Sequence, residues 1–236
     1  NQVKVRTKVY SLALLTSCFA GCSSTTASTF APAFDKKSSS YLTQPVPMVT
    51  ATEDQLQPSI SKSNHQLVYA ARVAGNLDIY LKSASQADAA SRLTEHSTDD
   101  TSPVFSPDAQ SIIWVSKRAD VKGDLWIMNR KGGAQRKLTT RDTADSSPVF
   151  HPDGEHVFFT SKSKRARRPG IRKLNLSSMH SELVEKNGWD PTISADGSTM
   201  VYVAMEPGEG LPRLYQRNLE TGSTRPMTQT VYAEGL

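Results

Sequence analysis

The stretch SSPVFHPDGEHVFFTSK, residues 146–162, decides the fold of this chain. It places a Pro-Asp-Gly corner between two short apolar runs that are rich in Val and Phe. The proline presets φ for the first central position of a turn, and the glycine accepts the positive φ that closes a bulged hairpin. The stretch therefore predicts two antiparallel strands joined by a tight corner.

The same pattern returns along the chain with a nearly constant period. One proline marks each copy, at Pro58, Pro103, Pro148 and Pro191, and these prolines lie 45, 45 and 43 residues apart. Nine residues after each proline an apolar run begins, namely LVYAA, IIWVS, VFFTS and MVYVA. Later segments recur as DIYLK, DLWIM, GIRKL and RLYQR, followed by RLT, KLT, ELV and PMT. Short runs of this composition, bounded by turn formers, predict four strands in each repeat.

A four-stranded sheet of about 45 residues cannot cover both of its faces, so successive copies must pack face to face around an axis. The sequence therefore predicts an all-β protein, a β-propeller of four-stranded antiparallel blades with four visible repeats. Their approximate bounds are 51–97, 98–142, 143–186 and 187–236. We expect these four repeats to be a truncated propeller or an open arc. A closed ring of four blades is the less expected alternative.

Two blocks carry a resemblance to a known family. They are SPVFSPDAQSIIWVSKRADVKGDLWIMNRKGGAQRKLT at 102–139 and SPVFHPDGEHVFFTS at 147–161. Both resemble the Pro-Asp-rich propeller repeat of the TolB-like family, a relative of the Trp-Asp (WD40-like) propellers, and the resemblance covers about residues 51–236. Propellers of this family generally have six blades. The resemblance implies a propeller that binds other proteins of the cell envelope.

The N-terminal residues 1–21 have the layout of a secretory signal peptide. Three cations, Lys4, Arg6 and Lys8, precede an apolar run that is too short to span a bilayer. The stretch FAGC resembles a bacterial lipobox, which implies that Cys22 carries a lipid. The alternative is ordinary cleavage near Ala20, which would leave an unmodified thiol.

Residues 22–50 are rich in Ser, Thr and Ala, which predicts a flexible tether between membrane and propeller. Cys18 is the only cysteine besides Cys22, so a mature domain cannot depend on disulfides. Ser23 after the cysteine resembles outer-membrane lipoproteins. We therefore expect a protein of the bacterial cell envelope that a lipid anchors in the outer membrane, with its propeller facing the periplasm.

The basic run KSKRARRPGIRK, residues 162–173, lies between the second and third strands of the third repeat. Its arginines Arg165, Arg167 and Arg168 are candidates to bind phosphates or an acidic partner, because guanidinium groups pair with both. The alternative is a solvated loop. Removal of the signal would reduce the formal charge from +5 to +2, so a nucleic-acid-binding surface is not implied.

The loops that enter the first strands supply the other candidates for partner binding. Asp100, Asp145 and Asp190 are expected on the same face as the basic run, acidic near the axis, although they could equally well cap turns. Trp189, just before Pro191, is a candidate contact for a ligand.

Motifs of catalysis are absent from the sequence: there is no G-x-S-x-G, H-E-x-x-H, P-loop or dinucleotide fingerprint. The five histidines are scattered, so neither a metal nor another cofactor is expected. The sequence favours a non-enzymatic envelope lipoprotein whose propeller is a scaffold for protein interactions. Two alternatives stay open: the propeller portion of a secreted prolyl-oligopeptidase-like hydrolase, and a carbohydrate-binding propeller.

Overall fold

The computed structural model describes residues 54–61, 65–73, 75–83, 89–206 and 210–227. The chain divides into two compact units, 1–46 and 47–236, and every described residue belongs to the second. The predicted signal peptide, Cys22 and the tether lie outside the described residues. Those that are described include no helix with the length and apolar character that crossing a membrane requires.

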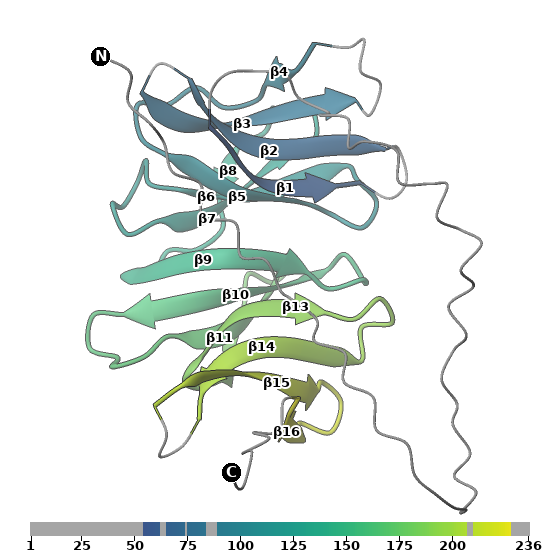
Figure 1. Ribbon diagram of the computed structural model, residues 1–236. Coiled ribbons are helices and arrows are strands. Elements are labelled where there is room, and N and C mark those ends of the chain that lie inside the picture. The colour runs from purple at the N-terminus through teal and green to yellow at the C-terminus, as the bar shows by residue number, and fades with distance from the viewer. Residues whose placement is uncertain (1–53, 62–64, 74, 84–88, 207–209, 228–236) are drawn as a thin grey trace, which may run out of the picture. The chain divides into compact units, whose positions relative to one another are not determined.

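The described strands form four sheets, each of four antiparallel strands in chain order (Figure 1). Blade one consists of β1 (Gln55–Ile60), β2 (Gln66–Val73), β3 (Asn76–Ser83) and β4 (Ser91–Arg92). Blade two consists of β5 (Asp100–Phe105), β6 (Ser111–Ser116), β7 (Asp124–Asn129) and β8 (Arg136–Lys137).

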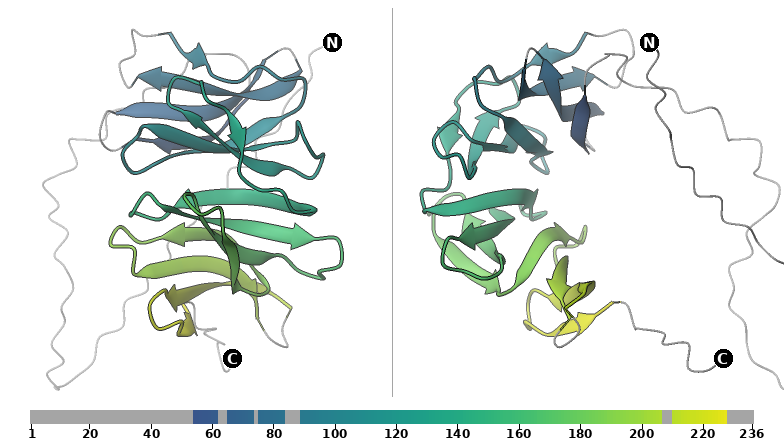
Figure 2. Two further views of the ribbon diagram at one scale, coloured as in Figure 1. Left: turned by 180° about the vertical axis from the view of Figure 1, so that it is seen from behind. Right: turned by 60° about the vertical axis from the view of Figure 1, so that its left-hand side comes forward.

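The third and fourth sheets repeat this meander. Blade three consists of β9 (Thr143–Phe150), β10 (His156–Ser163), β11 (Gly170–Asn175) and β12 (Ser181–Glu185). Blade four consists of β13 (Gly188–Ile193), β14 (Thr199–Met205), β15 (Pro212–Asn218) and β16 (Thr224–Pro226). The predicted all-β fold of four-stranded antiparallel blades is confirmed. The four described sheets are arranged as a fan and do not close into a ring (Figure 2).

Apolar clusters lie between consecutive blades and hold them together. Trp114 of blade two packs with Val68 and Ile79 of blade one. The next residue along β6, Ile113, belongs to the cluster that blade two shares with blade three. Alternate side chains of each strand therefore face opposite neighbours, as the pleat of a strand requires. Complete burial of one large apolar side chain contributes about 1.5–3 kcal/mol, which makes these interfaces the main source of stability.

The corner that the opening stretch predicts is present in three blades. In blade three the N–H of Gly154 donates to the carbonyl oxygen of His151 over 3.0 Å, and Gly154 has φ of 73°. The corresponding residues Ala109 and Gly197 have φ of 56° and 77°. The corner is thus a tight turn closed by a residue of positive φ, as predicted.

Each inner strand contains a β-bulge directly before its marker proline. The residues at these bulges, which all have φ near +50°, are Gln57, Ser102, Ser147 and Asp190. In blade three, Ser147 and Pro148 together oppose the single residue Phe159 of β10. The bulge shifts the alternation of the strand, so the buried positions are 143 and 145 before it and 148 and 150 after it.

Candidate functional site

The basic loop of blade three and the first strand of blade four lie on the same face and line two neighbouring pockets. Both pockets are lined by Arg168 and Pro169, from the loop between β10 and β11. We call them the apolar pocket and the cationic pocket after their linings. The candidate binding residues of the basic run and of β13 are therefore brought together, which the sequence analysis expects from the order of loops in a propeller.

The apolar pocket has a volume of about 450 Å³. Its lining residues come from β9, β10, the basic loop, β13 and β14, and they are Ala144, Ser146, Thr160, Lys162, Arg168, Pro169, Trp189, Asp190 and Met205. Trp189 is partly exposed, so its indole is available to a ligand. Two cations and one carboxylate accompany the apolar groups, a composition suited to a protein partner with an apolar side chain and a charged neighbour.

The bulge at Asp190 fixes the position of Trp189. The backbone N–H of Asp190 donates to Thr160 Oγ1 over 2.9 Å, and Asp190 Oδ1 accepts a hydrogen bond from Ser147 Oγ over 2.6 Å. These contacts connect β13 to the first two strands of blade three, β9 and β10. The preceding Trp189 is consequently held on strands and not on a mobile loop tip, which favours a preorganised binding site.

The cationic pocket has a volume of about 420 Å³. Five basic residues line it, namely Arg141, Arg167, Arg168, Arg172 and Lys186. The remaining lining residues are uncharged: Thr143, Ser161, Ser163, Ala166, Pro169, Gly170, Leu183 and Asn187. Burial and, next, the positive charge of Arg141 lower the pKa of Arg172. The cations therefore repel one another within this pocket.

The structure separates the predicted arginines. Arg167 and Arg168 line the cationic pocket, whereas Arg165 is exposed and lines neither pocket. The sequence analysis misses Arg141 and Lys186 as pocket residues. They come from the loops before β9 and before β13, and the only sequence signal for them is that such loops share a face with the basic run.

Two of the predicted aspartates are not on the surface, which corrects the expectation that Asp100 and Asp145 form an acidic surface near the axis. The Asp100 side chain has no exposed area and pairs with Arg118 over 2.7 Å. Asp145 is also buried, and its Oδ1 accepts hydrogen bonds from Thr143 Oγ1 and Ser161 Oγ over 2.8 and 2.6 Å. A buried carboxylate needs such partners, and both residues therefore fasten strands within their blades. Asp190 is exposed.

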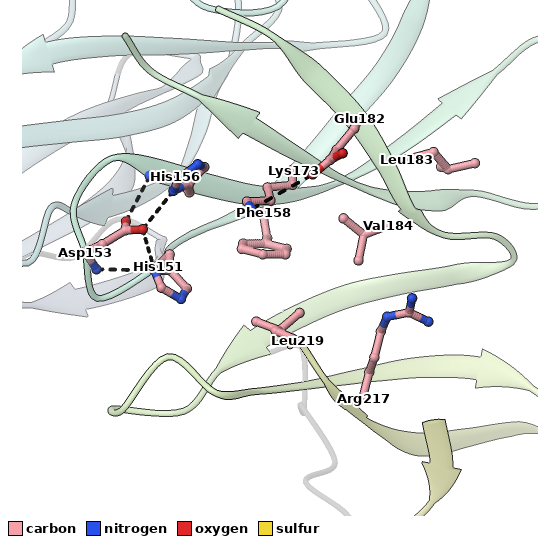
Figure 3. Close-up of a pocket in the computed structure, with 10 residues that line it drawn as sticks. All are labelled: His151, Asp153, His156, Phe158, Lys173, Glu182, Leu183, Val184, Arg217 and Leu219. Carbon is pink, nitrogen blue, oxygen red and sulfur yellow. Dashed lines mark hydrogen bonds and ion pairs between the residues drawn. The ribbon is translucent and has the colours of Figure 1, made fainter. Parts of the chain in front are cut away.

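A third pocket, of about 400 Å³, lies between blades three and four beside the His-Pro-Asp-Gly corner (Figure 3). His151 and His156 flank Asp153 there, and their Nδ1 atoms lie 2.8 and 2.7 Å from Asp153 Oδ2. Their ligand atoms all lie within 4.8 Å of one another, a spacing that could hold a metal ion. The sequence analysis, which treats the histidines as scattered, misses this cluster.

The hydrogen bonds around the cluster fit a structural corner better than a metal site. Asn175 Nδ2 lies 3.2 Å from His156 Nε2, while Asn175 Oδ1 accepts from the N–H groups of Ser177 and Ser178. His156 Nε2 is therefore an acceptor, and its Nδ1 carries the proton that faces Asp153. A metal would need the free lone pair of that Nδ1. In blades two and four a serine occupies the position of His151, and Ser106 Oγ and Ser194 Oγ each donate to the corner aspartate. His151 instead donates from Nε2 to the carbonyl oxygen of Gly197, and its Nδ1 accepts from the backbone N–H of Asp153.

The Asp153 carboxylate should make the protein sensitive to acid. Burial acts to raise its pKa, but hydrogen bonds from His156 and from backbone N–H groups outweigh burial and lower the pKa from 3.8 to about 2. The carboxylate therefore stabilises the fold above about pH 4, and this contribution is lost as the pH falls toward 2. We expect Asp153→Asn to flatten the pH dependence of the free energy of unfolding in this interval, measured by denaturant titration. An unchanged slope in the variant would contradict the assigned hydrogen bonds.

Comparisons with known proteins identify structures with a similar fold, but they do not identify the function of this chain. No known family model matches the chain, and no curated protein matches it. Among solved structures, TolB from Acinetobacter baumannii superposes with a TM-score of 0.63 at 18% identity, over 73% of this chain and 43% of that one. An oligogalacturonate lyase in complex with manganese has a TM-score of 0.63 at 14% identity, over 80% of this chain and 57% of that one.

A prolyl endopeptidase structure matches with a TM-score of 0.57 at 14% identity, over 76% of this chain and 30% of that one. The chain spans less than two thirds of the length of each of these three structures. At such identities the likeness concerns the fold alone. It shows that the described sheets have the architecture of the propeller domains found in TolB, in lyases and in prolyl peptidases.

Proposed function

We propose that this chain is a non-enzymatic interaction module of the bacterial envelope, which binds a protein partner through the apolar pocket and its cationic surroundings. A lipid on Cys22 would hold it at the membrane, in the outer membrane facing the periplasm. The observation that carries the binding proposal is the position of Trp189, which the bulge contacts of Asp190 hold beside Arg168 and Pro169.

The lining of the apolar pocket supports a protein partner. Trp and Arg dominate the energetic centres of protein interfaces, because they combine a large apolar area with directed polar contacts. Trp189 and Arg168 line the same pocket. Pro169 and Met205 add uncharged, apolar area to its lining. A partner segment with an apolar side chain next to a carboxylate would fill this pocket and pair with Arg168.

The experiment compares partner capture from envelope extracts by the full chain and by two variants, Trp189→Ala and Arg168→Glu. We expect Trp189→Ala to weaken a defined interaction by at least about 30-fold, since truncation of a central interface residue costs about 2 kcal/mol or more. Val121→Ala, at a side chain that is 83% exposed on blade two, is the matched control and should bind like the unchanged protein. Equal capture by Trp189→Ala and the control would reject the proposed surface.

A further inference from the structure

Blade three departs from blades one and two at the position where the cationic pocket lies. In blades one and two, the third strand contains a buried aspartate near its start, Asp78 or Asp124, which pairs with Arg92 or Lys137 over 2.6 and 2.8 Å. In blade three the equivalent residue is Gly170, which pairs with Ser161 as Asp124 pairs with Ser116. Blade three has therefore lost a buried negative charge at this position.

The same strand has also gained a positive charge. Two residues after each of these positions, blades one and two carry Tyr80 and Trp126, whereas blade three carries Arg172. Arg172 is held in place, because its Nε and Nη2 donate to Ser181 Oγ and to the carbonyl oxygen of Ser181 over 2.9 and 2.6 Å. A carboxylate and an aromatic ring are thus replaced by a glycine and a fixed guanidinium.

Four of the five cations of this pocket have no direct carboxylate partner in the described part of the chain, whereas Asp145 and Glu182 act electrostatically on the fifth, Arg172. The side chains of Arg141, Arg167, Arg168 and Lys186 make no ion pair or hydrogen bond with any of the described residues, and no acidic residue is among those described as lining the pocket. Elsewhere in the described blades, cations such as Arg118 and Arg217 do have carboxylate partners. A concave site that gathers unpaired cations, one of them half-buried, attracts an anion and is stabilised by it.

We infer that the cationic pocket binds a phosphate group, either as a soluble phosphate monoester or as the headgroup of a phospholipid. A carboxylate brings a single charge, whereas a phosphate monoester carries about two charges at pH 7 and three acceptor oxygens. Several guanidinium forks can share those oxygens through charge-assisted hydrogen bonds. Gly170 leaves no room for a larger residue at this position, because a Cβ there would lie 2.8 Å from the carbonyl oxygen of Glu185.

The test titrates the full chain with inorganic phosphate and with glycerol 3-phosphate at low ionic strength, by calorimetry. We expect saturable binding with a dissociation constant on the order of 1 mM or tighter, weakening as salt is added. The variant Arg141→Gln/Arg167→Gln/Lys186→Gln should bind roughly tenfold or more weakly, because charge-assisted hydrogen bonds are lost. The variant spares Arg168, so the protein partner of the apolar pocket should still be captured.

A matched control removes the same charge elsewhere. Arg130→Gln/Lys131→Gln/Arg136→Gln lies on blade two, outside the pocket, and should bind phosphate like the unchanged protein. Flotation with vesicles of phosphatidylcholine, with and without phosphatidic acid, distinguishes the two sources of the phosphate group. Recruitment by phosphatidic acid that the pocket variant loses indicates a lipid headgroup, and binding of the soluble esters alone indicates a free ligand. Absence of binding in every arm, or an equal loss in the control, overturns the inference.

Discussion

Replacement of Asp100 by alanine is expected to lower the free energy of unfolding by about 3–5 kcal/mol, because it leaves a charge without its partner inside blade two. The Asp100 side chain is fully buried, and Arg118, 15% exposed, pairs with it over 2.7 Å. Without Asp100 the guanidinium keeps its place over the rings of Trp114 and Trp126, at 5.5 and 4.8 Å from their centroids, but loses its counter-charge. Chemical denaturation of the purified chain measures the loss.

The control for this prediction is Asp54→Ala. Asp54 pairs with Arg72 over 3.9 Å, and the two side chains are 75% and 43% exposed. An exposed pair of this kind contributes at most about 1 kcal/mol. If Asp100→Ala were as mild as Asp54→Ala, the buried carboxylate would not be the partner that stabilises Arg118.

Replacement of Trp114 by alanine is expected to destabilise the chain by about 3–5 kcal/mol through lost apolar contacts and the cavity that remains. Trp114 is fully buried where blades one and two meet, with Val68, Ile79 and Phe105 in the same cluster. Thermal and chemical unfolding, followed by tryptophan fluorescence and circular dichroism, measure the effect. Because the cluster joins two blades, both signals should change together.

Val121→Ala again supplies a comparison, since its side chain is 83% exposed and its loss should change the free energy of unfolding by less than about 0.5 kcal/mol. A small effect of Trp114→Ala would mean that blades one and two do not share one core. That result would contradict the packing of consecutive blades on which the propeller fold depends.

Much of the fold can be predicted from the sequence because the repeat encodes it locally. The spacing of Pro58, Pro103, Pro148 and Pro191, the corner residues and the apolar runs each specify a strand or a turn within a few residues. The bulges are less apparent, since nothing in a residue such as Ser147 requires its φ of 49°. That conformation results from pairing with β10, which local sequence does not specify.

The candidate site is predicted less completely, because its residues meet only through tertiary structure. A run of basic residues reveals Arg167 and Arg168, but Arg141 joins them from another loop. Asp100 looks like a turn residue in the sequence, and its burial follows from its register with Ser116, which brings Arg118 close. Whether an aspartate is buried or available to a partner depends on its pairing with a cation elsewhere in the sequence, as Asp100 pairs with Arg118. A single sequence does not show which charged residues form such pairs.

The bulge in each inner strand divides that strand into two halves of opposite parity. In β9, Thr143 and Asp145 point into the core from odd positions, whereas Pro148 and Phe150 do so from even ones. Loss of the single residue Ser147 would remove the bulge and restore regular alternation, in which Thr143, Asp145, Pro148 and Phe150 still share one face of the strand. Loss of a residue outside the bulge, such as Val149, would instead move Phe150 to the opposite face. A single-residue deletion should therefore be tolerated better at the bulge than elsewhere in the inner strand.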